Sequence, residues 1–117
     1  MPRVLISDKM SPAATNIFKN RGIDVDVITD LEKNELIKII HDYDGLAVRS
    51  STRPDAEIIA AANKLKVIGR AGIGVDNIDI KAATDKGIVV MNTPFGNAIT
   101  TAEHAIAMLF SAARQIP

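Results

Sequence analysis

Two arginines stand directly after two short apolar runs, and their placement has a clear chemical meaning. Arg49 follows residues 45–48, and Arg70 follows residues 66–69. If both runs are neighbouring strands of one parallel sheet, the two guanidinium groups stand side by side at its carboxyl edge. There they would repel each other unless an anion lies between them. We therefore predict that Arg49 and Arg70 bind an anionic ligand.

Further groups suited to an anion follow the same predicted strands. Gly72 and Gly74 can turn successive backbone N–H groups inward as an anion nest, although a tight strand-to-helix turn is the commoner use of glycine. Asn97 can cap a helix whose N-terminus also attracts negative charge. Arg53 is as readily a solvated residue as a ligand contact. Asn77 fits a turn-stabilising role better than a ligand contact.

Several other chemistries lack their residues. The segment 72–77 imitates a dinucleotide fingerprint, but Asn77 replaces its third glycine and the segment does not open a βαβ unit, so we interpret it as a false match. There is no P-loop, no nucleophile elbow and no metal-spaced cluster. His104 lies in an apolar segment and is expected to pack in a core, and His41 is expected at a helix end. We predict no catalytic residue and no metal site in this chain.

Composition limits the partners. Lysine plus arginine and aspartate plus glutamate each number 14, so no net charge attracts the chain to nucleic acid or an anionic membrane. There is no cysteine, which excludes disulfides and thiol catalysis, and no apolar run is long enough to span a membrane. We expect a cytoplasmic protein.

The elements that must position these residues form a regular series. Apolar runs at residues 4–6, 25–28, 45–48, 66–69 and 88–91 alternate with helical patterns, which predicts an α/β fold with a doubly wound parallel sheet. The flavodoxin-like strand order 2-1-3-4-5 suits five such units. Asp24 and Asp26 alternate with valines, so the second strand is expected near an edge. Gly22 and Gly87 are expected to end helices.

The sequence excludes two other proteins of this architecture. A signalling receiver needs an aspartate after the third strand, where this chain has Arg49, and a lysine after the fifth, where it has Asn92 and Thr93. A flavodoxin-type electron carrier needs a phosphate loop after the first strand and aromatic side chains around its ring, but aromatic residues make up 3% of this chain.

The last predicted element differs from the others. From residue 98 to residue 113 the pattern predicts a helix that is apolar almost all round, which is typical of a helix buried on most sides. Five strands of this size cannot easily bury such a helix alone, so we expect further protein to cover it.

The strand ends also resemble those of a known family. The segments Val-Arg-Ser at 48–50, Gly-Arg-Ala-Gly-Ile-Gly-Val-Asp-Asn at 69–77 and Met-Asn-Thr-Pro at 91–94 closely resemble the D-2-hydroxyacid dehydrogenases. The resemblance covers essentially the whole chain. It implies a flavodoxin-like substrate-binding domain over residues 1–97 and an inter-domain helix over residues 98–117 that leads to an absent NAD-binding Rossmann domain. It implies a parent oxidoreductase that converts 3-phospho-D-glycerate to 3-phosphohydroxypyruvate with NAD, at the entry to serine biosynthesis, and that is a homo-oligomer.

The same resemblance implies roles for particular residues. Ile73 matches a position near the nicotinamide that is often threonine, and the proton-transferring residues of the family lie in the cofactor domain, so this chain alone is expected to be inactive. The alternatives are the substrate domain of another D-2-hydroxyacid dehydrogenase, or a stand-alone small-anion-binding module. The positions that match the family's substrate side are Arg49, Ser50, Arg70, Gly72, Gly74 and Asn97.

Overall fold

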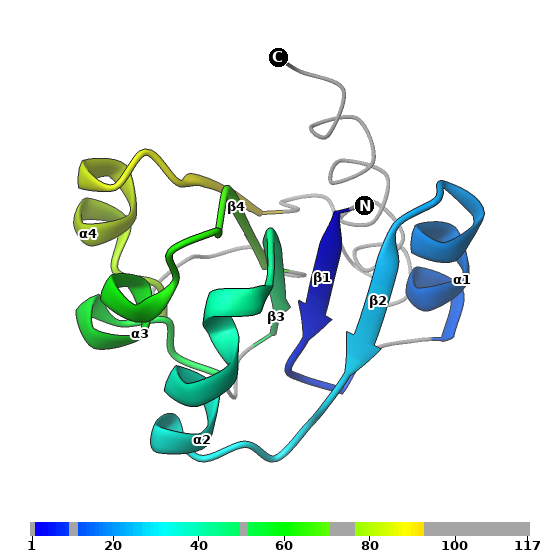
Figure 1. The fold of residues 1–117 in the computed structure, drawn as a ribbon, viewed down its shortest axis with the longest axis horizontal. Helices are drawn as coiled ribbons and strands as arrows, with labels where there is room; N and C mark the ends of the chain where they lie inside the picture. Colours follow the sequence, from blue (N-terminus) through cyan, green and yellow to red (C-terminus); the bar gives the residue numbers. More distant parts are fainter. Residues whose placement is uncertain (1, 10–11, 50–51, 71–76, 93–117) are drawn as a thin grey trace.

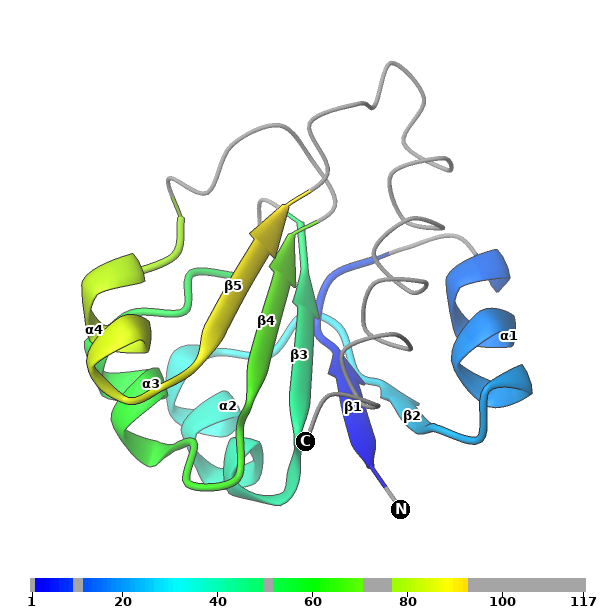
Figure 2. The ribbon, with the colours of Figure 1, turned by 90° about the horizontal axis from the view of Figure 1, so that it is seen from above.

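Five parallel strands form the centre of the computed structural model, which describes residues 2–9, 12–49, 52–70 and 77–92. The strands lie in the order β2-β1-β3-β4-β5, as predicted, and every neighbouring pair is parallel. Their arrowheads therefore point to one common edge of the sheet (Figure 2). The strands are β1 (Arg3–Ile6), β2 (Asp24–Val27), β3 (Gly45–Val48), β4 (Val67–Arg70) and β5 (Val89–Asn92).

Helices cover both faces of this sheet (Figure 1). Helices α2 (Lys33–Ile39), α3 (Ala56–Ala61) and α4 (Ile80–Asp85) lie on one face, and α1 (Pro12–Asn20) lies on the other. A short 3-10 helix, Ile40–Asp42, follows α2 and was not predicted. His41 lies in it, so its expected place at a helix end is confirmed.

The strand pleat divides the core into two clusters. On the face of α2, α3 and α4, Leu5, Leu46 and Ile68 pack with the buried side chains of these helices. On the other face, Phe18 of α1 packs against Ile6 and Ala47. Because side chains alternate along a strand, β1 and β3 contribute to both clusters, so the same strands support both layers.

Helix ends follow the local chemistry of the sequence. Asp55 and Asp79 cap α3 and α4 by accepting hydrogen bonds from the backbone N–H groups three residues later, at 3.1 and 3.0 Å. Gly22 and Gly87 follow α1 and α4 with φ values of 74° and 78°, the left-handed conformation expected of them. These two predicted helix ends are confirmed.

Strand boundaries differ from the predicted ones by single residues. The first strand begins one residue early, at Arg3, and the second both begins and ends one residue early, at Asp24 and Val27. The fourth and fifth strands both begin and end one residue late, at 67–70 and 89–92. Polar residues at a strand end satisfy the backbone ladder as well as apolar ones do, so hydropathy alone misplaces the boundary. The predicted helix at 98–113 lies outside the described residues.

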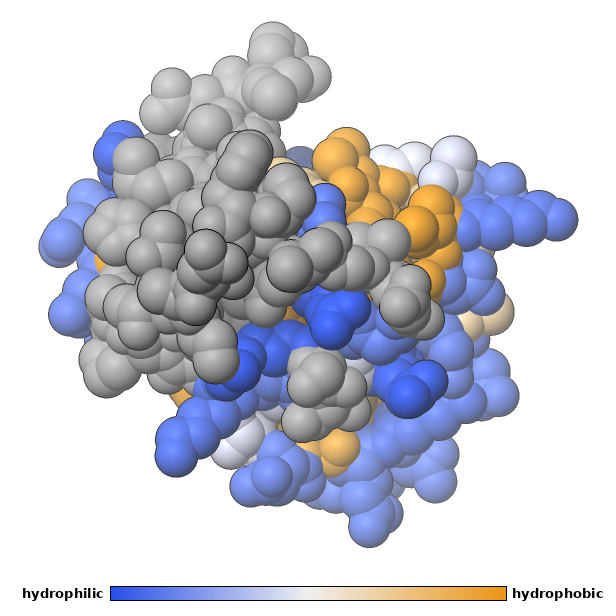
Figure 3. Space-filling view, turned by 180° about the vertical axis from the view of Figure 1, so that it is seen from behind, coloured by the Kyte–Doolittle hydropathy of each residue, from blue (hydrophilic) through white to orange (hydrophobic). Residues whose placement is uncertain are grey.

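Among the described residues seen from behind, most of the visible surface is hydrophilic, and the largest group of apolar side chains lies in the upper part of that face (Figure 3). The large apolar side chains that are exposed lie on the edge strands and their flanks, Val27, Ile28 and Val89, and at the start of α4, Ile80. Within the described residues, no helix has the length and hydropathy needed to cross a membrane.

Candidate functional site: the carboxyl edge of the sheet

The carboxyl ends of β1, β3 and β4 meet at one edge of the sheet, where ligands bind in folds of this kind. Strands β3 and β4 are neighbours, as the arginine argument requires. Arg70 is paired with Val48 in the sheet register. The Cα of Arg49 therefore lies one residue further along the strand direction than the Cα of Arg70. The expected side-by-side placement of the two arginines is corrected in this respect.

Arg49 reaches towards β1. Its Nη1 donates a hydrogen bond to the carbonyl oxygen of Lys9, just after β1, at 3.1 Å. Arg70 is half-buried and is the last residue of β4. Register partners in a parallel sheet share a face, so the Arg70 side chain leaves the sheet on the same face as Val48. Val48 packs in the core cluster on the face of α2, α3 and α4.

Arg70 and Asn77 each hold a buried polar atom in need of a partner. The Nε of Arg70 and the Oδ1 of Asn77 form no hydrogen bond with any residue that the structure describes. A buried donor without a partner carries a desolvation penalty of about 1–3 kcal/mol, so such atoms commonly mark a site for a ligand or an ordered water.

A buried carboxylate organises the centre of this edge. Asp8, directly after β1, is 4% exposed. Its Oδ2 accepts hydrogen bonds from the backbone N–H groups of Arg49 at 2.6 Å and Thr52 at 3.0 Å, and its Oδ1 accepts from the Thr52 hydroxyl at 2.6 Å. The Ser7 and Thr52 hydroxyl oxygens are 2.9 Å apart. Three donors satisfy the Asp8 carboxylate, and none of the ion pairs among the described residues includes it.

Asn77 completes the arrangement from the other side. Its Nδ2 donates to the carbonyl oxygens of Arg49 at 2.9 Å and Thr52 at 2.6 Å. Asn77 was predicted to stabilise its own turn, and residues 71–76 of that segment lie outside the described residues. The bonds that the structure shows hold the main chain of Arg49 and Thr52 after β3. Sequence reasoning missed Asp8 and Thr52. The signal was a polar pair, Ser7-Asp8, directly after a fully apolar strand.

The remaining predicted site residues divide into two groups. Arg53 is exposed, in the segment between β3 and α3. The others, Ser50, Gly72, Ile73, Gly74 and Asn97, lie outside the described residues.

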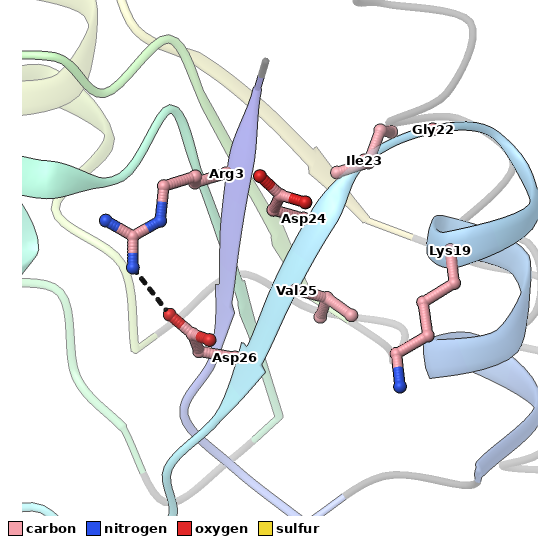
Figure 4. A pocket seen from close by; sticks show the side chains of 7 residues that line it. All are labelled: Arg3, Lys19, Gly22, Ile23, Asp24, Val25 and Asp26. Atoms are coloured by element: carbon pink, nitrogen blue, oxygen red, sulfur yellow. Dashed lines mark hydrogen bonds and ion pairs between the residues drawn. The ribbon is translucent and has the colours of Figure 1, made fainter.

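A hollow of about 410 Å3 lies along the edge strand β2, away from the carboxyl edge (Figure 4). Two of its charged residues form an ion pair, with Arg3 Nη2 2.8 Å from Asp26 Oδ2. The Tyr43 hydroxyl donates to the same Asp26 oxygen at 2.7 Å. That hydrogen bond, together with Arg3, lowers the pKa of Asp26. We assign this network a structural role. The hollow is lined by Arg3, Lys19, Gly22, Ile23, Asp24, Val25 and Asp26.

Comparison with known families identifies the class of protein that has this fold and this carboxyl edge. Residues 4–114 match the model of the D-isomer specific 2-hydroxyacid dehydrogenase catalytic domain, and the chain belongs to this family.

No group of His, Cys, Asp or Glu side chains among the described residues could hold a metal ion.

Within the family, the similar curated relatives share one activity. The chain is 52% identical over 115 residues to D-3-phosphoglycerate dehydrogenase from Archaeoglobus fulgidus and 50% identical over 115 residues to the human enzyme. Each match covers 98% of this chain and 22% of the relative. The chain therefore spans about a fifth of the length of these relatives.

Solved structures of similar proteins have the same fold as this chain. NAD+-bound 3-phosphoglycerate dehydrogenase from Entamoeba histolytica superposes with a TM-score of 0.73 at 37% identity, over 79% of this chain and 32% of that one. The TT0316 protein from Thermus thermophilus superposes with a TM-score of 0.75 at 36% identity, over 97% of this chain and 37% of that one.

Proposed function

We propose that this chain is the substrate-binding part of an NAD-dependent oxidoreductase that converts 3-phospho-D-glycerate to 3-phosphohydroxypyruvate, a step of serine biosynthesis. The observation that carries the proposal is the pair Arg49 and Arg70 at the ends of two neighbouring strands, with a buried Arg70 Nε that no described residue satisfies. Phosphoglycerate carries a carboxylate and a phosphate, and guanidinium groups suit both.

Arg49 and Arg70 are offset by one residue along the strand direction, which suits a ligand with two anionic ends better than one small anion. The Cα of Arg49 lies one residue beyond that of Arg70 along the strand direction, and the two side chains leave from different strands. A ligand that is charged at both ends can contact each arginine separately. We propose that Ser50, Arg53, Gly72, Gly74 and Asn97 complete this substrate side.

The hollow along β2 is not a basic site of the kind that holds a dinucleotide. The carboxylates of Asp24 and Asp26 balance its two cations, Arg3 and Lys19, so it has no excess positive charge for a pyrophosphate. We therefore propose that NAD is held mainly by a dinucleotide-binding domain that faces this chain across a cleft, with Ile73 near the nicotinamide. In that arrangement the present chain binds and orients the substrate.

Titration of the chain with 3-phosphoglycerate, followed by NMR at low ionic strength, tests the proposal. We expect a dissociation constant in the millimolar range, about 4 kcal/mol of binding free energy, because one side of the cleft supplies all the contacts. Arg49→Ala and Arg70→Ala should each weaken binding at least fivefold. Arg21→Ala is the matched control, since it removes one arginine just after α1, where the chain enters the opposite end of the sheet. No ligand-dependent shift near Arg49 or Arg70 contradicts the proposal.

Two further ligands separate the alternatives. If inorganic phosphate binds as tightly as 3-phosphoglycerate, the site is a small-anion module. If D-lactate binds more tightly, the chain belongs to a dehydrogenase of another 2-hydroxyacid. The proposal expects 3-phosphoglycerate to bind more tightly than both.

A further inference from the structure

Two residues after β3, Arg49 and Thr52, are each held by the same two side chains. Asp8 accepts hydrogen bonds from the backbone N–H groups of Arg49 and Thr52. Asn77 donates to the carbonyl oxygens of the same residues. The N–H and C=O groups of both residues are therefore bound to side chains from other segments of the chain.

The chemistry of the two side chains matches these tasks. A carboxylate offers acceptors only, and Asp8 faces two N–H groups and one hydroxyl. The Asn77 amide offers two N–H donors to two carbonyl oxygens. The partners are 25 to 44 residues apart along the chain, so the contacts fix Arg49 and Thr52 against the end of β1 on one side and the segment before α4 on the other.

The negative charge of Asp8 requires an explanation at an edge that attracts anions. A carboxylate there opposes anion binding by Coulomb repulsion. Its burial at 4% exposure and its three hydrogen bonds indicate that its acceptor geometry is what the site uses.

We propose that Asp8 and Asn77 are positioning residues for substrate binding: together they hold the main chain of Arg49 and of Thr52 in place, so that Arg49 is presented to the anion. This inference rests on the proposed function for its ligand. Asp8 and Asn77 contact the main chain and act on the ligand through Arg49.

The hydrogen bonds among Ser7, Thr52 and Asp8 allow the effect of the conservative variant Asp8→Asn to be predicted. In the wild type the Thr52 hydroxyl donates to Asp8, so the Ser7 hydroxyl donates to Thr52. In Asp8→Asn the amide oxygen still accepts both backbone N–H groups, and the amide nitrogen donates to Thr52, whose hydroxyl then donates to Ser7. The three contacts to Arg49 and Thr52 keep their geometry, while the Ser7 hydroxyl proton loses its Thr52 acceptor and one negative charge is lost.

The test measures 3-phosphoglycerate affinity and backbone amide exchange on the same variants of the chain. Asp8→Ala is expected to weaken binding at least tenfold and to speed exchange of the Arg49 and Thr52 amides. Asp8→Asn is expected to bind as tightly as the wild type, or up to a few times more tightly. Asn77→Ala, which leaves both carbonyl oxygens without their donor, is expected to weaken binding as Asp8→Ala does, and it serves if Asp8→Ala does not fold.

Asp44 supplies the matched control. Its Oδ2 accepts the backbone N–H of Arg3 at 2.9 Å and so joins the same two strands, β1 and β3, at the opposite end of the sheet. Asp44→Ala removes the same charge and a comparable hydrogen bond. It should speed exchange of the Arg3 amide and leave 3-phosphoglycerate affinity within twofold of the wild type.

The outcomes separate this inference from the proposed function. A wild-type chain that binds no 3-phosphoglycerate overturns the proposed function and, with it, the ligand half of this inference. A wild type that binds, with folded Asp8→Ala binding equally well, overturns the inference alone. Unchanged exchange of the Arg49 and Thr52 amides in Asp8→Ala overturns it whatever the ligand does. A tenfold loss in Asp8→Asn would assign the carboxylate charge a direct role and overturn the positioning role.

Discussion

Tyr43 joins burial and charge in a way that makes stability depend on pH. Burial of the ring, followed by the hydrogen bond to Asp26, raises the pKa of Tyr43 from about 10 to about 12. Arg3 lies over the same ring, 4.9 Å from its centre. Below pH 10 the phenol keeps its proton in the folded and unfolded chain, and its contribution to stability is complete. Between pH 10 and 12 the unfolded chain loses the proton first, so this contribution falls.

We therefore predict that Tyr43→Phe reduces the loss of stability between pH 10 and pH 12. A full two-unit shift corresponds to ~2.7 kcal/mol, and the half-exposed Arg3–Asp26 pair reduces the expected effect to about 1 kcal/mol. Urea unfolding of both proteins at pH 8 and pH 11.5 measures it. Parallel pH dependence in the two proteins would show that Tyr43 titrates in the folded state as it does in the unfolded chain.

At the scale of the element, Gly87 ends α4 through its backbone conformation. Its φ is 78°, and a Cβ added there would meet no atom within 4 Å. Gly87→Ala therefore tests backbone strain without a steric clash. We expect it to lower the free energy of unfolding by about 1 kcal/mol, and Gly87→Asn to lower it less, because asparagine tolerates the left-handed conformation. Thermal unfolding of the three proteins measures this order, and equal stability of all three would contradict it.

Elements could be predicted from the sequence because their signals are local. The apolar run at 45–48 and the alternation around Asp26 fixed a buried strand and an edge strand, and the structure confirms both. The contacts of the carboxyl edge could not be predicted in the same way. Asp8 meets Thr52 across 44 residues, and no spacing pattern states which turn a buried carboxylate will hold.

The relative placement of Arg49 and Arg70 could not be predicted from the sequence either. Neighbouring strands could be inferred from the strand order, but the level of Arg70 depends on the register, which pairs it with Val48. A shift of one residue in register sends a side chain to the other face of the sheet. Sequence patterns located β4 to within one residue, which is too coarse to decide this point.

At the scale of the whole molecule, the two core clusters share the strands that lie between them. Phe18 fills the cluster under α1, and Leu46 fills the cluster under α2 and α3, and both are 0% exposed. Because β1 and β3 contribute alternate side chains to both clusters, loss of packing on one face weakens the support of the other. The sheet and its two helical layers should therefore unfold together.

We predict that Leu46→Ala and Phe18→Ala each lower the free energy of unfolding by about 3 kcal/mol, and each within one cooperative transition. For a domain of this size such a loss lowers Tm by roughly 10 °C or more. Ile80→Ala, at a position that is 45% exposed, is the control and should cost about 0.5 kcal/mol. Circular dichroism and amide exchange, followed together through urea unfolding, decide the matter. Amides of α1 that open in Phe18→Ala well before those of β3 would show that the α1 layer is an independent unit, and the argument from shared strands would fail.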